Sequence, residues 1–89
     1  MAFCVVEVQP TPNPNALKFL LDRPIAEQPT SFFDASAAIG HPVASRLFAI
    51  RGVSSLLLLG DFVTVNKTPD ASWPDIKSRV QRALSEVEA

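Results

Sequence analysis

Sulfur is scarce in this sequence, because Cys4 is the single cysteine among its 89 residues. An internal disulfide is therefore excluded, whereas small domains of oxidising compartments usually carry several. Three glycines are too few to build a glycine-rich phosphate-binding loop. The first residues also show neither a basic region nor a long apolar stretch typical of an export signal. These features predict a protein of a reducing compartment, and we expect a cytoplasmic location.

Neither charge sign predominates, since eight Lys and Arg face nine Asp and Glu for a formal charge of −1. The basic surface needed to bind a phosphate backbone is missing, so no nucleic-acid partner is expected. The longest aliphatic run is residues 56–59, whereas a membrane-spanning helix needs about 20 apolar residues. No membrane partner is expected either. Hydrophobic residues make up 47% of the chain, which is typical of a globular protein, and this length predicts one domain over residues 1–89.

Strand patterns dominate the first third of the chain. Residues 3–8 are rich in β-branched and apolar types, and residues 16–21 alternate as a half-buried strand does. Between them lie Pro10, Pro12 and Pro14, which remove backbone donors and favour extended geometry, so a stiff loop is expected there. Residues 30–34 form a weaker strand candidate, because Pro24 and Pro29 interrupt the pattern before them.

Helix and hairpin signals follow. Pro42 suits the first position of a helix whose apolar residues recur to Ile50, and Gly52 suits the position just after its end. The pair Gly60-Asp61 separates residues 53–59 from residues 62–67, which predicts a tight β-hairpin. A second helix is expected from Trp73, with Ser72 and Asp75 as a capping box and an apolar stripe along one side. This order predicts an α+β fold, a two-layer sandwich of mainly antiparallel sheet with two helices on one face.

The loop and its surroundings carry a resemblance. The segment QPTPNPNALKF, residues 9–19, resembles the opening motif of the N-terminal domain of NifU-like (Nfu) iron-sulfur cluster scaffold proteins. Residues 42–53 are similar to the first helix of that domain, residues 60–67 to its hairpin, and the Trp73 region to the start of its last helix. The resemblance covers residues 5–88.

The resemblance implies a role in iron-sulfur cluster assembly, but not the cluster-binding step itself. In two-domain members of the family, a Cys-x-x-Cys pair in a separate C-terminal domain holds the cluster, and cluster binding commonly needs four thiolates. This sequence offers Cys4 alone. We therefore expect a stand-alone, non-catalytic protein-binding module of iron-sulfur cluster assembly or transfer, which binds a scaffold, carrier or client protein and holds no cofactor or metal. The sequence shows no nucleophile paired with a base, no paired carboxylates at a recognisable spacing and no phosphate-binding loop, so we do not expect an enzyme.

The expected contact surface consists of Thr11, Asn13, Asn15 and the neighbouring Lys18. Prolines lower the ordering cost of binding, and the asparagine amides offer paired donors and acceptors. The alternative is a purely structural loop, in which the asparagine side chains cap their own turn.

Two other functions stay open. One is iron or iron-sulfur binding by a dimer bridged through Cys4, although a lone thiol in an apolar strand is usually a small hydrophobic residue. His41 is predicted to be a surface or capping group rather than its second ligand. The other is a ligand-free oligomerisation domain, because residues 56–59 place leucines on both faces of a strand, and helices on one face would leave some of them exposed.

Overall fold

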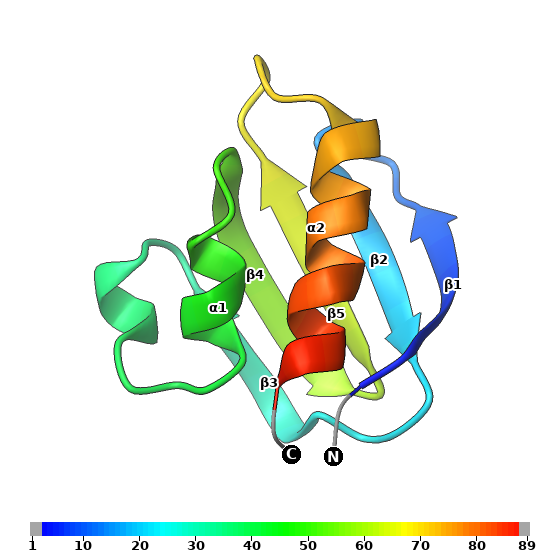
Figure 1. Ribbon diagram of the computed structural model, residues 1–89, viewed down its shortest axis with the longest axis vertical. Helices are drawn as coiled ribbons and strands as arrows, with labels where there is room; N and C mark the ends of the chain where they lie inside the picture. Colours follow the sequence, from blue (N-terminus) through cyan, green and yellow to red (C-terminus); the bar gives the residue numbers. More distant parts are fainter. Residues whose placement is uncertain (1–2, 88–89) are drawn as a thin grey trace.

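The computed structural model describes residues 3–87, which form a five-stranded sheet packed against two α-helices (Figure 1). The strands are β1 (Val5–Pro10), β2 (Ala16–Leu21), β3 (Ala26–Phe32), β4 (Val53–Gly60) and β5 (Phe62–Lys67). A short 3-10 helix, η1 (Ser36–Ala38), and helix α1 (Ala44–Phe48) lie between β3 and β4 in the sequence. Helix α2 (Trp73–Glu86) follows β5.

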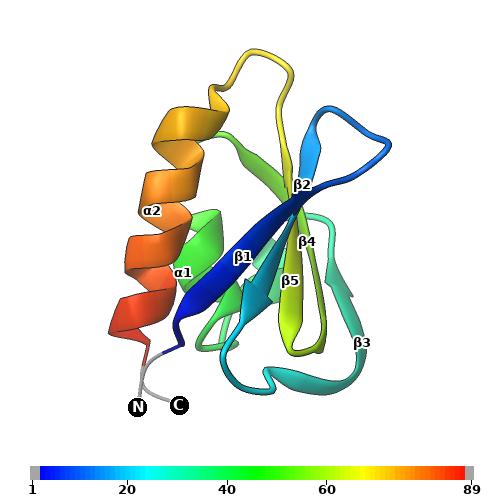
Figure 2. The same cartoon turned by 90° about the vertical axis from the view of Figure 1, so that its right-hand side faces the viewer.

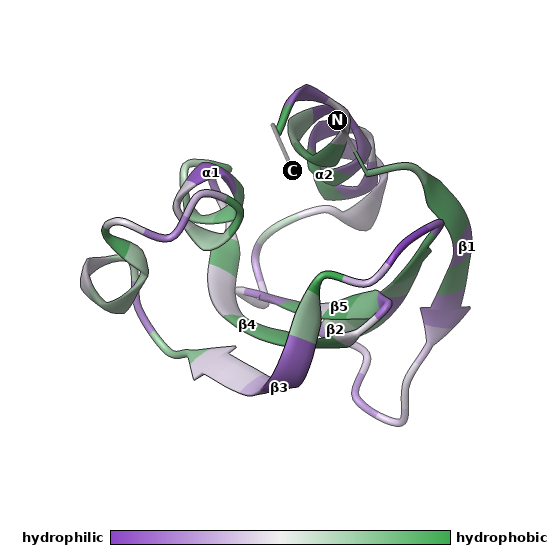
Figure 3. Cartoon of the chain, turned by 90° about the horizontal axis from the view of Figure 1, so that it is seen from below, coloured by the Kyte–Doolittle hydropathy of each residue, from purple (hydrophilic) through white to green (hydrophobic). Residues whose placement is uncertain are grey.

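The sheet is antiparallel throughout, with the strand order β1-β2-β5-β4-β3. Both α-helices lie on the same face, as the view along the layers shows (Figure 3). The expected α+β two-layer sandwich is thereby confirmed. The hairpin prediction is also correct, because Leu59 pairs with Phe62 across Gly60 and Asp61. Gly60 has a φ of +56°, which suits the first central residue of a tight hairpin turn.

The core lies between the sheet and the helices. Phe19 on β2 and Leu58 on β4 both pair with Val63 on the central strand β5, and none of these three side chains is exposed. Because side chains of a strand alternate between its faces, these pairs form one apolar layer. The remaining large side chains that are almost fully buried come from both layers: Leu56 and Val65 from the sheet, and Leu47, Ile76, Val80 and Leu84 from the helices.

Strand β3 is longer than predicted and begins earlier, at Ala26 instead of residue 30. Pro29 is tolerated because β3 is an edge strand, where a missing backbone donor can face away from the sheet. The pairing also shifts there: Ala26 pairs with Gly60 and Thr30 with Leu58, so two extra residues of β3 bulge out. In a sequence pattern, such a proline indicates the end of a strand. Here the strand continues through it because β3 lies at the edge of the sheet.

Helix α1 is shorter than predicted, because it spans Ala44–Phe48 instead of residues 42–50. The residues on both sides form turns. At its entrance, His41 Nδ1 accepts hydrogen bonds from the amides of Val43 at 3.3 Å and Ala44 at 3.1 Å. The ring of His41 also packs edge-on against Phe32, with 5.1 Å between ring centres. His41 is therefore a capping group, as predicted, and it stands in for the usual hydroxyl or carboxylate cap.

Helix α2 begins at Trp73, as predicted, and buries the expected apolar stripe. The predicted capping box is wrong. Ser72 occupies the N-cap position in an extended conformation, but its side chain makes no capping hydrogen bond. Asp75 does not reach back either, because its carboxylate lies 3.3 Å from Arg79 Nε one turn further along the helix. The helix start is maintained instead by the backbone, where the Ile76 amide donates to the Ser72 carbonyl oxygen at 3.1 Å.

The sheet face opposite the helices carries the other leucines of β4. Leu56 and Leu58 are buried in the core, whereas Leu57 and Leu59 are half-buried on the opposite face. The prediction that this strand supplies apolar side chains to both faces is correct. The connection from β2 to β3 passes around the hairpin end, where the Ile25 amide donates to the Gly60 carbonyl oxygen.

Candidate partner-binding site

The loop between β1 and β2 projects from the end of the sheet (Figure 2) and is ordered by its own side chains. The Thr11 hydroxyl lies 2.9 and 3.0 Å from the carbonyl oxygens of Asn13 and Ala16, which share its single proton, and it accepts from the Asn13 amide at 3.1 Å. Asn13 Oδ1 accepts from the Asn15 amide at 2.8 Å, which is an Asx turn. Thr11 and Asn13 thus fix the shape of the loop, while the Asn13 side chain stays exposed. The structural alternative is correct for Asn13, whose side chain caps its own turn, but not for Asn15, whose side chain contacts Lys67.

Two long-range contacts tie the loop to the rest of the fold. Lys67 Nζ donates to Asn15 Oδ1 at 2.9 Å, and the Lys67 amide donates to the Asn15 carbonyl oxygen at 2.7 Å. Trp73 Nε1 donates to the Pro14 carbonyl oxygen at 2.9 Å. Lys67 and Trp73 also approach each other, with Nζ 5.9 Å from the ring centre. The loop is therefore held by the end of β5 and the start of α2, and sequence reasoning missed both partners as parts of this site.

Lys18 lies apart from this cluster. It is on β2 opposite Thr64 of β5, and its Nζ sits 4.2 Å from the ring centre of Phe62. This cation-π contact places Lys18 on the sheet face away from the helices, since its neighbour Phe19 is buried on the helix side. The structure brings together Thr11, Asn13 and Asn15, and it puts Lys18 on an adjoining surface.

A cavity of about 420 Å³ lies at the start of α2, between the β5–α2 turn and the exit of α1. Arg51 contributes positive charge and Asp70 and Asp75 contribute negative charge to its wall. Hydrogen bonds, first from the Thr68 side chain and then from its own backbone, hold the pKa of Asp70 below its ordinary value, and Arg51 and Lys67 add to this. No sequence motif pointed to this cavity, because its wall joins the exit of α1 with the β5–α2 turn.

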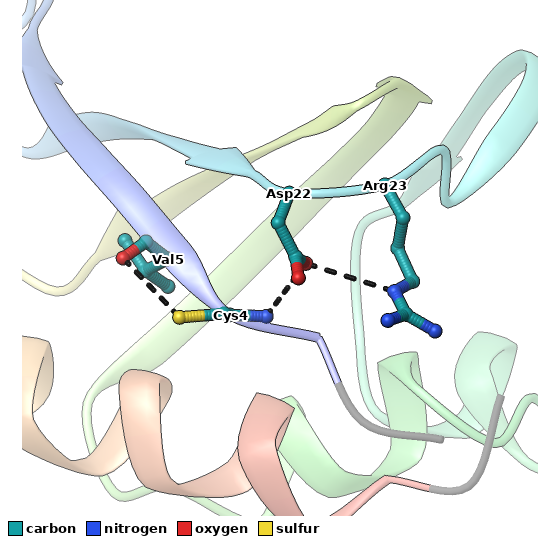
Figure 4. A network of polar contacts seen from close by, with 4 residues as sticks. All are labelled: Cys4, Val5, Asp22 and Arg23. Atoms are coloured by element: carbon teal, nitrogen blue, oxygen red, sulfur yellow. Dashed lines mark hydrogen bonds and ion pairs between the residues drawn. The ribbon is translucent and has the colours of Figure 1, made fainter.

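Cys4 is exposed, immediately before β1, so its prediction as a small hydrophobic residue within an apolar strand is wrong (Figure 4). Its amide donates to Asp22 Oδ1 at 2.9 Å, and its carbonyl oxygen accepts from the Asp22 amide at 3.0 Å. Asp22 in turn lies 3.7 Å from Arg23 Nε. This arrangement fastens the start of β1 to the end of β2 through the backbone and leaves the thiol outside it.

Within residues 3–87, no three His, Cys, Asp or Glu side chains are grouped so that they could hold a metal ion. The Nδ1 of His41 is already engaged by backbone amides, so this nitrogen is not free to pair with Cys4. Over the same part of the chain, no helix combines the length and the apolar character that a membrane crossing requires.

These features define a class: a small α+β sandwich with a proline- and asparagine-rich loop fastened to its last helix. The sequence profile described as "Scaffold protein Nfu/NifU N terminal" matches residues 6–89. The chain belongs to this family, as the resemblance indicated. The family description is that of a scaffold protein.

Curated relatives agree with this assignment. The chain is 35% identical over 80 residues to "NifU-like protein 4, mitochondrial" of Arabidopsis thaliana and 38% identical over 84 residues to "NFU1 iron-sulfur cluster scaffold homolog, mitochondrial" of Homo sapiens. The alignments cover 89% and 88% of this chain but 28% and 33% of those proteins. The chain thus spans about a third of the length of these relatives.

Solved structures share the fold. The solution structure of a NifU-like protein from Saccharomyces cerevisiae superposes with a TM-score of 0.80 at 28% identity, covering 96% of this chain and 77% of that one. A crystal structure of a Staphylococcus aureus protein superposes with a TM-score of 0.77 at 21% identity, covering 90% and 96% of the two chains. The latter likeness concerns the fold alone.

Proposed function

We propose that this domain is a non-catalytic protein-binding module of iron-sulfur cluster assembly or transfer, and that it docks a scaffold, carrier or client protein through its β1–β2 loop. The observation that carries the proposal is the double tethering of that loop, by Lys67 to Asn15 and by Trp73 to Pro14. Names of relatives that contain "iron-sulfur cluster scaffold" support the pathway.

The tethering supports a binding role because it removes an entropic cost. A free loop loses conformational freedom when a partner orders it, whereas a loop already held in one shape does not. The exposed positions Pro12 and Asn13 are thereby presented at fixed places. Lys18 adds a positive charge on the adjoining sheet face. Thr11 and Asn15 serve this surface by holding its shape, and Asn13 and Lys18 supply the contacts.

The test is a titration of the labelled protein with purified iron-sulfur assembly proteins, a scaffold, a carrier and a client in turn. Amide shifts should gather on residues 10–18. Asn13→Asp keeps the oxygen that closes the Asx turn but replaces the amide donor by a second oxygen, so it should weaken binding about tenfold, in line with a lost interfacial hydrogen bond to a charged or polar partner. Gln81→Glu makes the same chemical change at an exposed position of α2 and should leave the affinity unchanged.

Two results would contradict the proposal. If none of the assembly proteins shifts any amide, the domain has no docking role in this pathway. If binding occurs but Asn13→Asp and Gln81→Glu behave alike, the β1–β2 loop is not the contact surface.

The competing functions have their own tests. Anaerobic reconstitution with iron and sulfide, followed by absorbance, tests the dimer bridged by Cys4: a charge-transfer band that disappears in Cys4→Ala would establish it. Sedimentation over a range of concentrations tests the oligomerisation domain, whose contact would use Leu57 and Leu59. For the location, we propose a reducing compartment. The relatives' names specify mitochondria, which does not fit the expected cytoplasmic location. Cell fractionation would distinguish the two compartments.

A further inference from the structure

Two large apolar side chains stand out into solvent on one short segment. Phe33 is 79% exposed and Ile39 is 80% exposed, and they flank η1 in the connection from β3 to α1. We call residues 33–39 the η1 segment. It follows β3, at the opposite edge of the sheet from β1, and it stands clear of the sheet beside α1 (Figure 1). It is therefore separate from the β1–β2 loop.

The η1 segment is anchored to the core and ordered by its own hydrogen bonds. Ala38 is fully buried and anchors it to the core, and the Ala38 amide donates to the Ala35 carbonyl oxygen at 3.1 Å. Asp34 Oδ1 accepts from the Ser36 hydroxyl at 2.7 Å and from the Ala37 amide at 2.8 Å. The backbone is thus shaped in advance while Phe33 and Ile39 point away from the core. Ordered, exposed apolar side chains of this size are typical of contact surfaces.

The η1 segment carries only negative charge. Asp34 is its single ionisable side chain, and no Lys or Arg occurs within residues 33–39. The hydrogen bond from Ser36, followed by that from the Ala37 amide, lowers the pKa of Asp34 below its ordinary value, so the carboxylate is ionised at neutral pH. A surface that fits this segment must offer apolar area with positive charge beside it.

We propose that the η1 segment is a second docking surface, which inserts Phe33 and Ile39 into an apolar groove rimmed by lysine or arginine on a partner protein of the assembly system. This inference rests on the proposed function. Charge complementarity favours such a partner over a second copy, because a two-fold contact through this segment would bring two Asp34 carboxylates together. An anionic membrane surface would meet the same repulsion.

The test measures dissociation constants by calorimetry for the same purified scaffold, carrier and client proteins. The double variant Phe33→Ala/Ile39→Ala should bind on the order of 30-fold more weakly, as expected for apolar side chains at the centre of an interface. Val6→Ala is the matched control, because Val6 is also a large exposed apolar residue, at 63% exposure, but lies on β1. It should change the affinity less than twofold. Unchanged melting temperatures would show that the variants are folded.

Asp34→Asn tests the charge. It should weaken binding severalfold at low salt and make the affinity less dependent on ionic strength, since a charge pair across the interface is lost. A partner that binds the double variant as well as wild type overturns the inference. If that partner is nevertheless weakened by Asn13→Asp, the proposed function stands without the second surface. If no assembly protein binds at all, both fall.

Two further outcomes would assign the η1 segment to another occupant and overturn the inference. One is self-association, seen by sedimentation, that the double variant abolishes. The other is binding to vesicles of phosphatidylcholine and phosphatidylglycerol that the double variant abolishes.

Discussion

Gly52 occupies a position where two physical constraints meet. Its φ is +101°, a backbone region that other residues adopt only at a cost. A Cβ at this position would lie 2.7 Å from Ala71 Cβ and 3.2 Å from Ile76 Cδ1. The glycine therefore allows the exit of α1 to pass against the start of α2, where both segments line the cavity.

We predict that Gly52→Ala destabilises the fold by about 2–4 kcal/mol, as the sum of the conformational cost and the overpacking. Gly40→Ala separates the two terms, because Gly40 has a φ of +89° but a Cβ added there would meet no atom within 4 Å. It should cost only about 1–2 kcal/mol. Urea denaturation of both variants checks this, and equal costs would show that the contact with Ala71 has no effect.

The Asp70 carboxylate should respond to loss of its Thr68 partner. Thr68→Val removes the hydroxyl that most strongly lowers the pKa of Asp70, so this pKa should rise toward its ordinary value. Since the folded-state pKa lies below that of the unfolded chain, ionised Asp70 stabilises the fold above about pH 4, and the effect is lost as the pH falls through the folded-state pKa. Carbon-detected NMR titration measures the shift. Thr64→Val, the same change on β5, should leave it unaltered.

The β1–β2 loop depends on an element distant in sequence, helix α2. Trp73→Phe retains an aromatic ring but removes the indole donor to the Pro14 carbonyl oxygen. We expect a loss of about 1 kcal/mol in unfolding free energy, typical of one hydrogen bond, together with faster motion of the loop. Denaturation and amide relaxation measure the two effects. Relaxation rates in residues 10–15 that match wild type would mean that the indole does not hold the loop.

Across the whole molecule, stability should decrease from the centre of the sheet toward the β3 edge. Strand β5 pairs on both sides and its Val63 and Val65 are fully buried, whereas β3 pairs on one side with a shifted register. Hydrogen exchange should therefore be slowest in β5 and fastest, among the strands, at Glu27 and Gln28. Equal protection of these amides and those of β5 would show that the bulge in β3 is as stable as the centre.

Several elements could be predicted because their signals are local. The alternation in residues 16–21, the Gly60-Asp61 turn and the apolar stripe of α2 each follow from neighbouring residues and the periodicity of a strand or helix. The same holds for His41, whose place before Pro42 indicated a surface or capping group. For these residues the local sequence favours one backbone conformation, and the folded protein adopts it.

The remaining features depend on residues far apart in the chain. Asn15 is bound by Lys67, 52 positions away, and Pro14 by Trp73, 59 positions away. Pro29 is acceptable in β3 because that strand lies at an edge, and Cys4 is exposed although the preceding Phe3 is buried in the core. Local patterns describe how a segment prefers to fold, whereas these contacts follow from strand order and packing. The family could thus be read from short motifs, and the shape of its candidate binding surface required the folded chain.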